Sequence, residues 1–147
     1  MDLAHELHDL VRTLDKWAEK ILRPEGLTYN QYVALVILSQ HPGITGRLLA
    51  KSLGVTEAAG SGIVKVLLTK DFVTNHAAIG SGNRRELHIT PAGQEKTDRC
   101  GHLLGHSLDD NARAIGLDPS GLAATIRSLH DEVRTVRHPG EHADPAP

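Results

Sequence analysis

The sequence predicts a mainly α-helical fold that carries one small β-hairpin. Towards both ends of the 147-residue chain, apolar residues recur at intervals of three and four, the period of an amphipathic helix. Only 3% of the residues are aromatic, so we expect a core of Leu, Val, Ile and Ala, which suits helices. The stretch from Thr45 to Thr90 differs, because it predicts two short helices joined by a tight turn and then two strands. That order is typical of a winged helix-turn-helix.

The first two helices have clear end signals. Thr28, with Gln31 three residues later, matches a capping box that opens the second helix. We expect that helix to run to about Gln40, where the sequence His41-Pro42-Gly43 stops it. The first helix ends before Pro24 and has one apolar face, formed by Leu3, Leu7, Leu10, Leu14, Trp17, Ala18 and Ile21.

The turn motif is predicted from small and apolar residues at fixed places. Thr45 and Thr56 are the candidate N-caps of its two helices. Ala50 has a small Cβ that lets the helices cross closely, and Gly54 can take the positive φ of a sharp helix end. Three apolar residues would hold the helices at a fixed angle, namely Leu49, Leu53 and Val55.

A β-hairpin is expected next, with strand-like runs from Phe72 to Ile79 and from Arg85 to Ile89 around the turn Gly80-Ser81-Gly82-Asn83. Thr90-Pro91 then opens a fifth helix, since Thr can cap a helix and Pro is tolerated at its first position.

We expect that fifth helix to continue past Gly105 as one unusually long helix that ends at Gly116. Asp118-Pro119 repeats the combination of cap and proline before a last helix. From His138 onward the chain is Pro-rich and has no apolar anchors, which predicts a disordered tail over residues 138–147.

Three segments of the chain resemble the MarR family of bacterial transcription regulators. They are LTYNQYVALVIL at Leu27 to Leu38, GRLLAKSLGVT at Gly46 to Thr56, and LHITPAG at Leu87 to Gly93. The resemblance implies a homodimeric DNA-binding protein, commonly a repressor whose DNA affinity changes when a small molecule binds. It also implies a single domain over residues 1–137, in which residues 28–90 bind DNA and residues 1–23 and 91–137 form dimerisation helices.

The apolar stripes on the two terminal helices independently predict a homodimer. Within one subunit these stripes have little core to cover, and two copies around a twofold axis would bury them. The two recognition helices would then lie about 34 Å apart, one turn of B-DNA, which favours an inverted-repeat operator. The alternative is a monomeric bundle in which the terminal helices pack on each other.

The charge distribution is consistent with a double-stranded DNA partner, although the net charge of the chain is −2. Between Ile44 and Thr90 there are six basic and three acidic residues, a local charge of +3, so the remainder carries −5. Positive charge is thus concentrated where phosphate contacts need it. A solvated helical surface can produce the same bias by chance.

The candidate DNA contacts are Thr45, Arg47, Thr56, Ala58, Ser61, Lys65, Arg84 and Arg85. The two arginines follow Ser81-Gly82-Asn83, which stands where the family has an Asp-x-Arg element at the hairpin tip. Either these arginines bind in a narrow minor groove or to phosphates, or they are solvated strand residues without a DNA role.

Gly60 and Gly62 make the proposed recognition helix, Thr56 to Thr69, unusual, because family members commonly have a branched apolar residue where Gly60 stands. Two interpretations follow. Either the absent side chains let the backbone approach the groove, or the helix is frayed and DNA binding is weakened. The second leads to another function class, a winged-helix protein that acts as a protein-interaction or ligand-binding module.

The resemblance implies a cleft for a small aromatic or phenolic effector between the dimer helices and the DNA module. Leu14, Trp17, Tyr32 and Val36 are candidates to line it, although Trp and Tyr at helical spacing are equally common in ordinary cores.

The sequence predicts no enzymatic activity, cofactor or metal. It has no nucleophile elbow, phosphate-binding glycine loop or HExxH motif. His5 with His8, and His102 with His106, share helix faces, but no ligand cluster completes a zinc site. Cys100 is alone, so no intrachain disulfide forms. Because no apolar run approaches membrane-spanning length, we expect a cytoplasmic protein that has no membrane partner.

Overall fold

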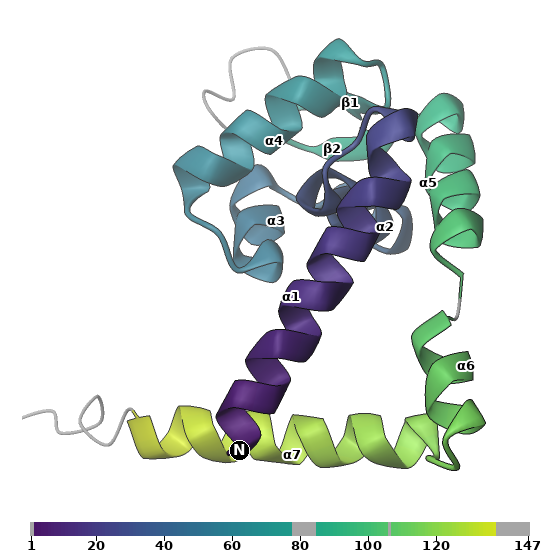
Figure 1. The fold of residues 1–147 in the computed structure, drawn as a ribbon. Coiled ribbons are helices and arrows are strands. Elements are labelled where there is room, and N and C mark those ends of the chain that lie inside the picture. Colours follow the sequence, from purple (N-terminus) through teal and green to yellow (C-terminus); the bar gives the residue numbers. More distant parts are fainter. Residues whose placement is uncertain (1, 78–84, 106, 138–147) are drawn as a thin grey trace, which may run out of the picture. The chain divides into compact units, whose positions relative to one another are not determined.

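The computed structural model describes residues 2–77, 85–105 and 107–137 (Figure 1). The chain divides into two units, Met1–Gly105 and His106–Pro147. The first unit contains α1 (Leu3–Leu22), the short 3-10 helix η1 (Arg23–Glu25), α2 (Tyr29–Gln40), α3 (Gly46–Leu53), α4 (Glu57–Thr69), β1 (Val73–Asn75), β2 (Leu87–Ile89) and α5 (Pro91–Leu104). The second contains α6 (Ser107–Ala114) and α7 (Pro119–Arg137).

Four threonines begin helices as the sequence predicts. The side chains of Thr28, Thr45, Thr56 and Thr90 each accept a hydrogen bond from the backbone N–H three residues later. At α2 the capping box is complete, because the side chain of Gln31 accepts from the backbone N–H of Thr28. Each such cap stabilises its helix by about 1 kcal/mol, so local sequence alone determines where these helices start.

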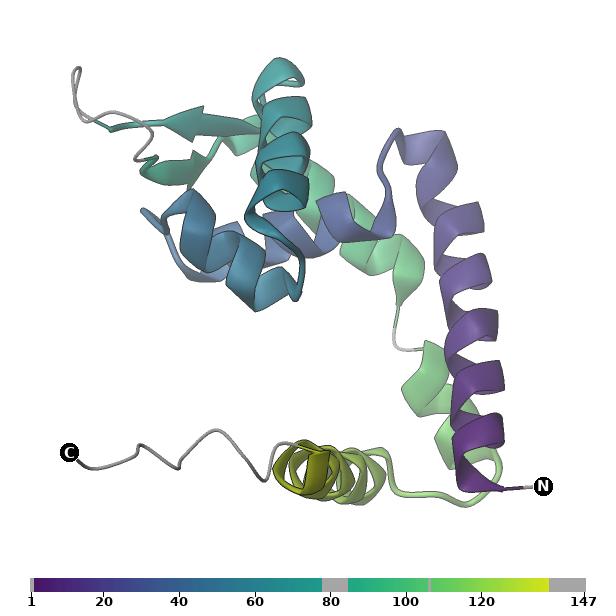
Figure 2. The same ribbon diagram turned by 90° about the vertical axis from the view of Figure 1, so that its left-hand side faces the viewer.

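The core of the first unit forms around α2, which packs against α1, α3, α4, α5 and β2. The largest fully buried side chains come from six different elements and are Leu22, Leu35, Leu38, Leu49, Leu67, Leu87, Val64 and Cys100. The core is aliphatic, as the low aromatic content predicts. Figure 2 shows the N-terminal part of α1 extending away from this core. The apolar residues Leu3, Leu10 and Val11 on that part are exposed in the single chain.

The crossing of α3 and α4 explains Gly60. A Cβ built on this glycine would lie only 2.6 Å from the Cβ of Ala50, so the two helices approach more closely than any larger residue allows. Gly60 is buried in this contact and α4 is a regular helix through it. Gly60 therefore faces α3 and not the groove, and the predicted fraying of the helix is wrong, whereas weakened DNA binding stays a prediction. Gly62 is exposed, and a Cβ there would meet nothing within 4 Å.

The hairpin pairs β1 and β2 antiparallel, with Val73 opposite Ile89 and Asn75 opposite Leu87. Each strand has three residues, so both are shorter than the sequence predicts. The predicted turn at residues 80–83 lies outside the described residues.

The prediction of one long helix from Thr90 to Gly116 is wrong. α5 ends at Leu104, and Gly105 has φ 60° and ψ −166°, a conformation that is essentially restricted to glycine. α6 then begins at Ser107, and Gly116, with φ 80°, follows its end. Isolated glycines are tolerated inside helices, so the sequence did not reveal at which glycine the helix ends.

α7 begins as predicted, because the side chain of Asp118 accepts a hydrogen bond of 2.9 Å from the backbone N–H of Gly121. One face of α7 carries apolar residues that alternate at spacings of four and three: Leu122, Ile126, Leu129, Val133 and Val136. All five are exposed in the single chain. None of the described helices is long and apolar enough to cross a membrane.

Candidate nucleic-acid interface and the adjacent pocket

α4 presents three of the predicted DNA contacts on one exposed face. Ala58, Ser61 and Lys65 are spaced by three and four residues and are all exposed. The opposite face of the helix is buried in the core and contains Gly60, Val64 and Leu67. The helix thus has a clear outer surface, but only two of its three candidate contacts there carry polar side chains.

Thr45 and Thr56 lie at the start of α3 and α4. The hydroxyl oxygen of Thr45 accepts from the Leu48 N–H at 3.2 Å, and that of Thr56 accepts from the Ala59 N–H at 3.1 Å. A hydroxyl that accepts one hydrogen bond can still donate its own hydrogen. Both threonines can therefore cap a helix and donate to a phosphate oxygen at the same time.

Arg47 forms an ion pair across the turn motif. Its Nε lies 3.3 Å from Oε1 of Glu57, which joins the first turns of α3 and α4. Both side chains are largely exposed, so the pair contributes little stability and Arg47 can exchange to another anion.

Arg85 does not extend outward from the hairpin. It is half-buried, and its Cδ lies 3.9 Å from the position that a Cβ on Gly46 would occupy, at the start of α3. Its Nη1 is buried and has no hydrogen-bond partner among the described residues. A buried donor without a partner is costly. Arg84, the other predicted wing contact, lies outside the described residues.

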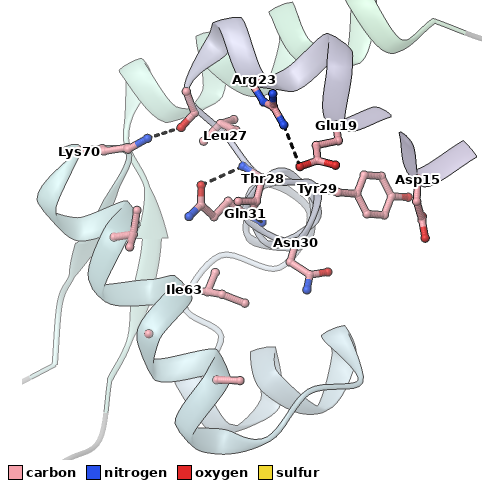
Figure 3. Close-up of a pocket in the computed structure, with 14 residues that line it drawn as sticks. Asp15, Glu19, Arg23, Leu27, Thr28, Tyr29, Asn30, Gln31, Ile63 and Lys70 are labelled. Atoms are coloured by element: carbon pink, nitrogen blue, oxygen red, sulfur yellow. Dashed lines mark hydrogen bonds and ion pairs between the residues drawn. The ribbon is translucent and has the colours of Figure 1, made fainter. Parts of the chain in front are cut away.

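A pocket of about 970 Å³ lies between α4 and the corner where α1 meets α2 (Figure 3). Its lining comes from the end of α1, the first turn of α2 and one flank of α4. The residues are Asp15, Glu19, Arg23, Gly26, Leu27, Thr28, Tyr29, Asn30, Gln31, Ala59, Gly62, Ile63, Val66 and Lys70. Gly62 lines the pocket and is also next to the exposed Ser61, so the pocket flank and the outer face of α4 adjoin.

The corner beside this pocket is tied to α5 by charge. Glu25 accepts hydrogen bonds from Arg99 at 2.9 Å and from Lys96 at 3.0 Å. The hydrogen bond from Arg99, followed by that from Lys96, holds the pKa of Glu25 below its ordinary value. Glu25 is the residue before Gly26, so these bonds restrain the pocket edge.

The same corner is tied to the recognition helix by Lys70. This residue caps the C-terminus of α4, and its Nζ donates a hydrogen bond to the carbonyl oxygen of Gly26. The pocket is therefore bounded at one end by a direct link between α4 and the α1–α2 corner. Lys70 was not among the predicted site residues, because no motif or spacing marks a contact between residues 44 positions apart.

The four predicted ligand residues do not line this pocket. Trp17 is 37% exposed on α1, and the hydroxyl of Tyr32 faces Gly101 of α5. Leu14 and Val36 are half-buried. The ligand role of these four residues stays a prediction. Most of the residues that line the pocket are polar or charged, and none of the four predicted residues is among them.

No three His, Cys, Asp or Glu side chains come together as possible metal ligands in residues 2–77, 85–105 and 107–137. In the first histidine pair, His5 lies 3.4 Å from Asp9, and in the second, His106 lies outside the described residues. Cys100 is buried, and burial raises the pKa of its thiol.

Residues 25–81 match the model of the MarR family. The matched segment includes the turn motif and β1. This match spans 57 of the 147 residues, and over these residues the chain is similar to the MarR family. Among curated proteins, the HTH-type transcriptional repressor Rv2887 of Mycobacterium tuberculosis is 32% identical over 79 residues. This alignment covers 54% of our chain and only 57% of the relative, so the chain spans little more than half the length of the curated relatives that it matches.

Solved MarR-family structures share the fold over most of the chain. The apo form of Escherichia coli MarR has a TM-score of 0.68 at 22% identity and covers 90% of this chain and 97% of its own. The Staphylococcus aureus MepR–DNA complex has a TM-score of 0.75 at 15% identity, with coverage of 92% and 98%. The M. tuberculosis MarR family protein Rv2887 in complex with salicylic acid has a TM-score of 0.63 at 25% identity, with coverage of 89% and 96%.

Proposed function

We propose that this protein is a homodimeric, sequence-specific DNA-binding transcriptional regulator, and a repressor, whose DNA affinity responds to a small molecule. The observation that carries the proposal is the exposed face of α4 with Ala58, Ser61 and Lys65, together with the capping hydroxyls of Thr45 and Thr56 at the starts of α3 and α4. The description of the M. tuberculosis relative as a transcriptional repressor supports the direction of control. In this proposal the protein acts in the cytoplasm, is not an enzyme and forms one functional domain over residues 1–137.

DNA would be held mainly through its phosphates. Thr45 and Thr56 supply donors at the starts of α3 and α4, where helix dipoles also favour an anion, and Arg85 adds a positive charge near the start of α3. Base reading would fall to Ser61 and Lys65, since Ala58 and Gly62 present no hydrogen-bonding side chain. Phosphate contacts release counterions, so we expect affinity to fall steeply with salt and sequence preference to be modest.

A second copy of the chain would cover the exposed apolar residues of α1 and α7. Apolar residues at alternating spacings of four and three suit helix-to-helix packing. Single apolar residues scattered over a surface are ordinary, but a row of them along one helix face indicates an interaction surface. A twofold axis through this interface would place two copies of α4 for an inverted-repeat operator.

The pocket offers a physical route from ligand to DNA. One wall belongs to α4 and the other to the α1–α2 corner, which Glu25 anchors to α5. A molecule that fills the pocket would push α4 relative to the corner and so change its position in the groove. Ligand and DNA affinities would then be coupled reciprocally.

The test is fluorescence anisotropy with the protein's own upstream intergenic DNA and a scrambled duplex, each at two salt concentrations. We expect salt-sensitive binding that prefers the native fragment. Lys65→Ala should weaken binding and reduce the salt dependence by about one counterion. The matched control Lys20→Ala removes an exposed charge from α1 and should change neither the DNA affinity nor its salt dependence.

Equal or absent binding to both duplexes would overturn the proposal. That result would favour the other function class, a winged-helix protein that binds ligands or protein partners. The small number of polar side chains on the outer face of α4 is the observation that keeps this alternative open.

A further inference from the structure

We propose that the pocket beside α4 binds an organic cation, and that Asp15 is the residue that selects for positive charge. The inference depends on the proposed function only in treating this pocket as the effector site. It assigns both a ligand class and a specificity residue.

Four charged side chains line the pocket: Asp15, Glu19, Arg23 and Lys70. Three of them already have an ion-pair or hydrogen-bond partner. Arg23 Nη2 pairs with Glu19 Oε1 at 3.3 Å, and Lys70 donates to the carbonyl of Gly26. Asp15 has no ion-pair or hydrogen-bond partner among the described residues. Lys70 keeps its positive charge, because a carbonyl oxygen does not neutralise an ammonium group, so among these residues the pocket has an unpaired negative charge at Asp15 and an unpaired positive charge at Lys70.

An aromatic ring lies on the same side of the pocket as this carboxylate. Tyr29 lines the same pocket, is 48% exposed, and in Figure 3 points toward Asp15. Figure 3 also shows Lys70 at the other side of the pocket. A cation over a tyrosine ring gains attraction from the negative face of the ring, in addition to the attraction of the carboxylate. The Asp15 end of the pocket thus suits a positive group.

α4 provides an apolar wall of the pocket. Ala59, Gly62, Ile63 and Val66 present only apolar atoms or bare backbone along this flank. A Cβ at Gly62 would meet nothing within 4 Å, so the absent side chain leaves room in the pocket. An apolar body can lie on this wall while its charge faces Asp15 and Tyr29.

These features also argue against two other ligand classes. A metal ion needs more ligands than one free carboxylate, and the described residues hold no group of three candidate ligands. An organic anion placed against the ring of Tyr29 would face the carboxylate of Asp15, which repels it.

The test uses two probes of the same shape and opposite charge, tetraphenylphosphonium and tetraphenylborate, titrated calorimetrically into the full chain without DNA. One added charge pair in a partly exposed site changes binding by about tenfold, so we expect tetraphenylphosphonium to bind about tenfold more tightly than tetraphenylborate. Asp15→Asn should abolish this preference. Glu19→Gln should also reduce it, because it releases Arg23.

The control variant Glu6→Gln removes a carboxylate from the same helix, outside the pocket, and should leave both affinities unchanged. Circular dichroism will verify that each variant is folded, which is expected because Asp15 is exposed. Equal or tighter binding of tetraphenylborate, or undiminished preference in Asp15→Asn, would overturn the inference.

The DNA anisotropy assay separates this inference from the proposed function. Cation binding without any DNA binding would overturn the proposed regulator and support the cation site. DNA binding with no affinity for tetraphenylphosphonium would support the regulator and overturn the cation site.

Discussion

Replacing Gly60 with alanine is expected to destabilise the protein, whereas the same change at Gly62 is expected to stabilise it. In any helix interior, Gly→Ala gains up to about 1 kcal/mol because alanine loses less conformational entropy on folding. At Gly62 nothing opposes this gain, since the new Cβ meets no atom within 4 Å.

At Gly60 the gain is outweighed by a steric conflict. The new Cβ would lie 2.6 Å from the Cβ of Ala50 and 3.2 Å from its Cα, whereas carbon atoms prefer separations of about 3.5–4.0 Å. α3 and α4 would have to separate by roughly 1 Å, and overpacking of this kind costs about 1–3 kcal/mol. Gly60→Ala should therefore lose up to about 2 kcal/mol net, the difference between the overpacking cost and the gain in helix propensity.

Urea unfolding of the two variants at one fixed protein concentration measures this difference. Ala50→Gly combined with Gly60→Ala removes the conflict and should recover much of the loss. Because the conflict displaces α4, Gly60→Ala should also weaken DNA binding more than Gly62→Ala does. If Gly60→Ala proved as stable as Gly62→Ala, the close crossing of α3 and α4 would be refuted.

Further predictions concern the pocket, the corner and the dimer. Lys70→Met breaks the link to Gly26 and should reduce the response of DNA affinity to a pocket ligand, measured by anisotropy with Lys20→Met as the control. A response as large as in the wild type would exclude Lys70 from the coupling. The pKa of Glu25 is lowered in the folded state, so its contribution to stability is complete above its unfolded value of about 4.5 and is lost as pH falls below it. In thermal unfolding from pH 7 to pH 3, Glu25→Gln should be less stable than wild type at pH 7, and this difference should shrink on acidification; a difference independent of pH would contradict this role. Ile126→Asp places a charge on the apolar face of α7 and should produce monomers in sedimentation experiments, with weaker binding to an inverted repeat.

Predictions from local sequence were accurate where the structure depends on neighbouring residues. The N-caps at Thr28, Thr45, Thr56 and Thr90 were predicted because a capping hydrogen bond spans only three residues. The break at Gly105 was not predicted, because the same segment contains a second glycine, Gly101, which remains helical. Which of the two leaves the helix depends on the conformation of the whole segment.

The sequence by itself determined the order of the elements up to α5 and the starts of four helices, since short-range hydrogen bonds and apolar periodicity encode them. Only the tertiary structure decided what Gly60 does, because its reason is Ala50 on another helix. The same holds for the pocket, which combines residues 15–31 with residues 59–70, and for Lys70, whose partner Gly26 is 44 positions away. Contacts between distant segments arise from packing, and no local pattern records them.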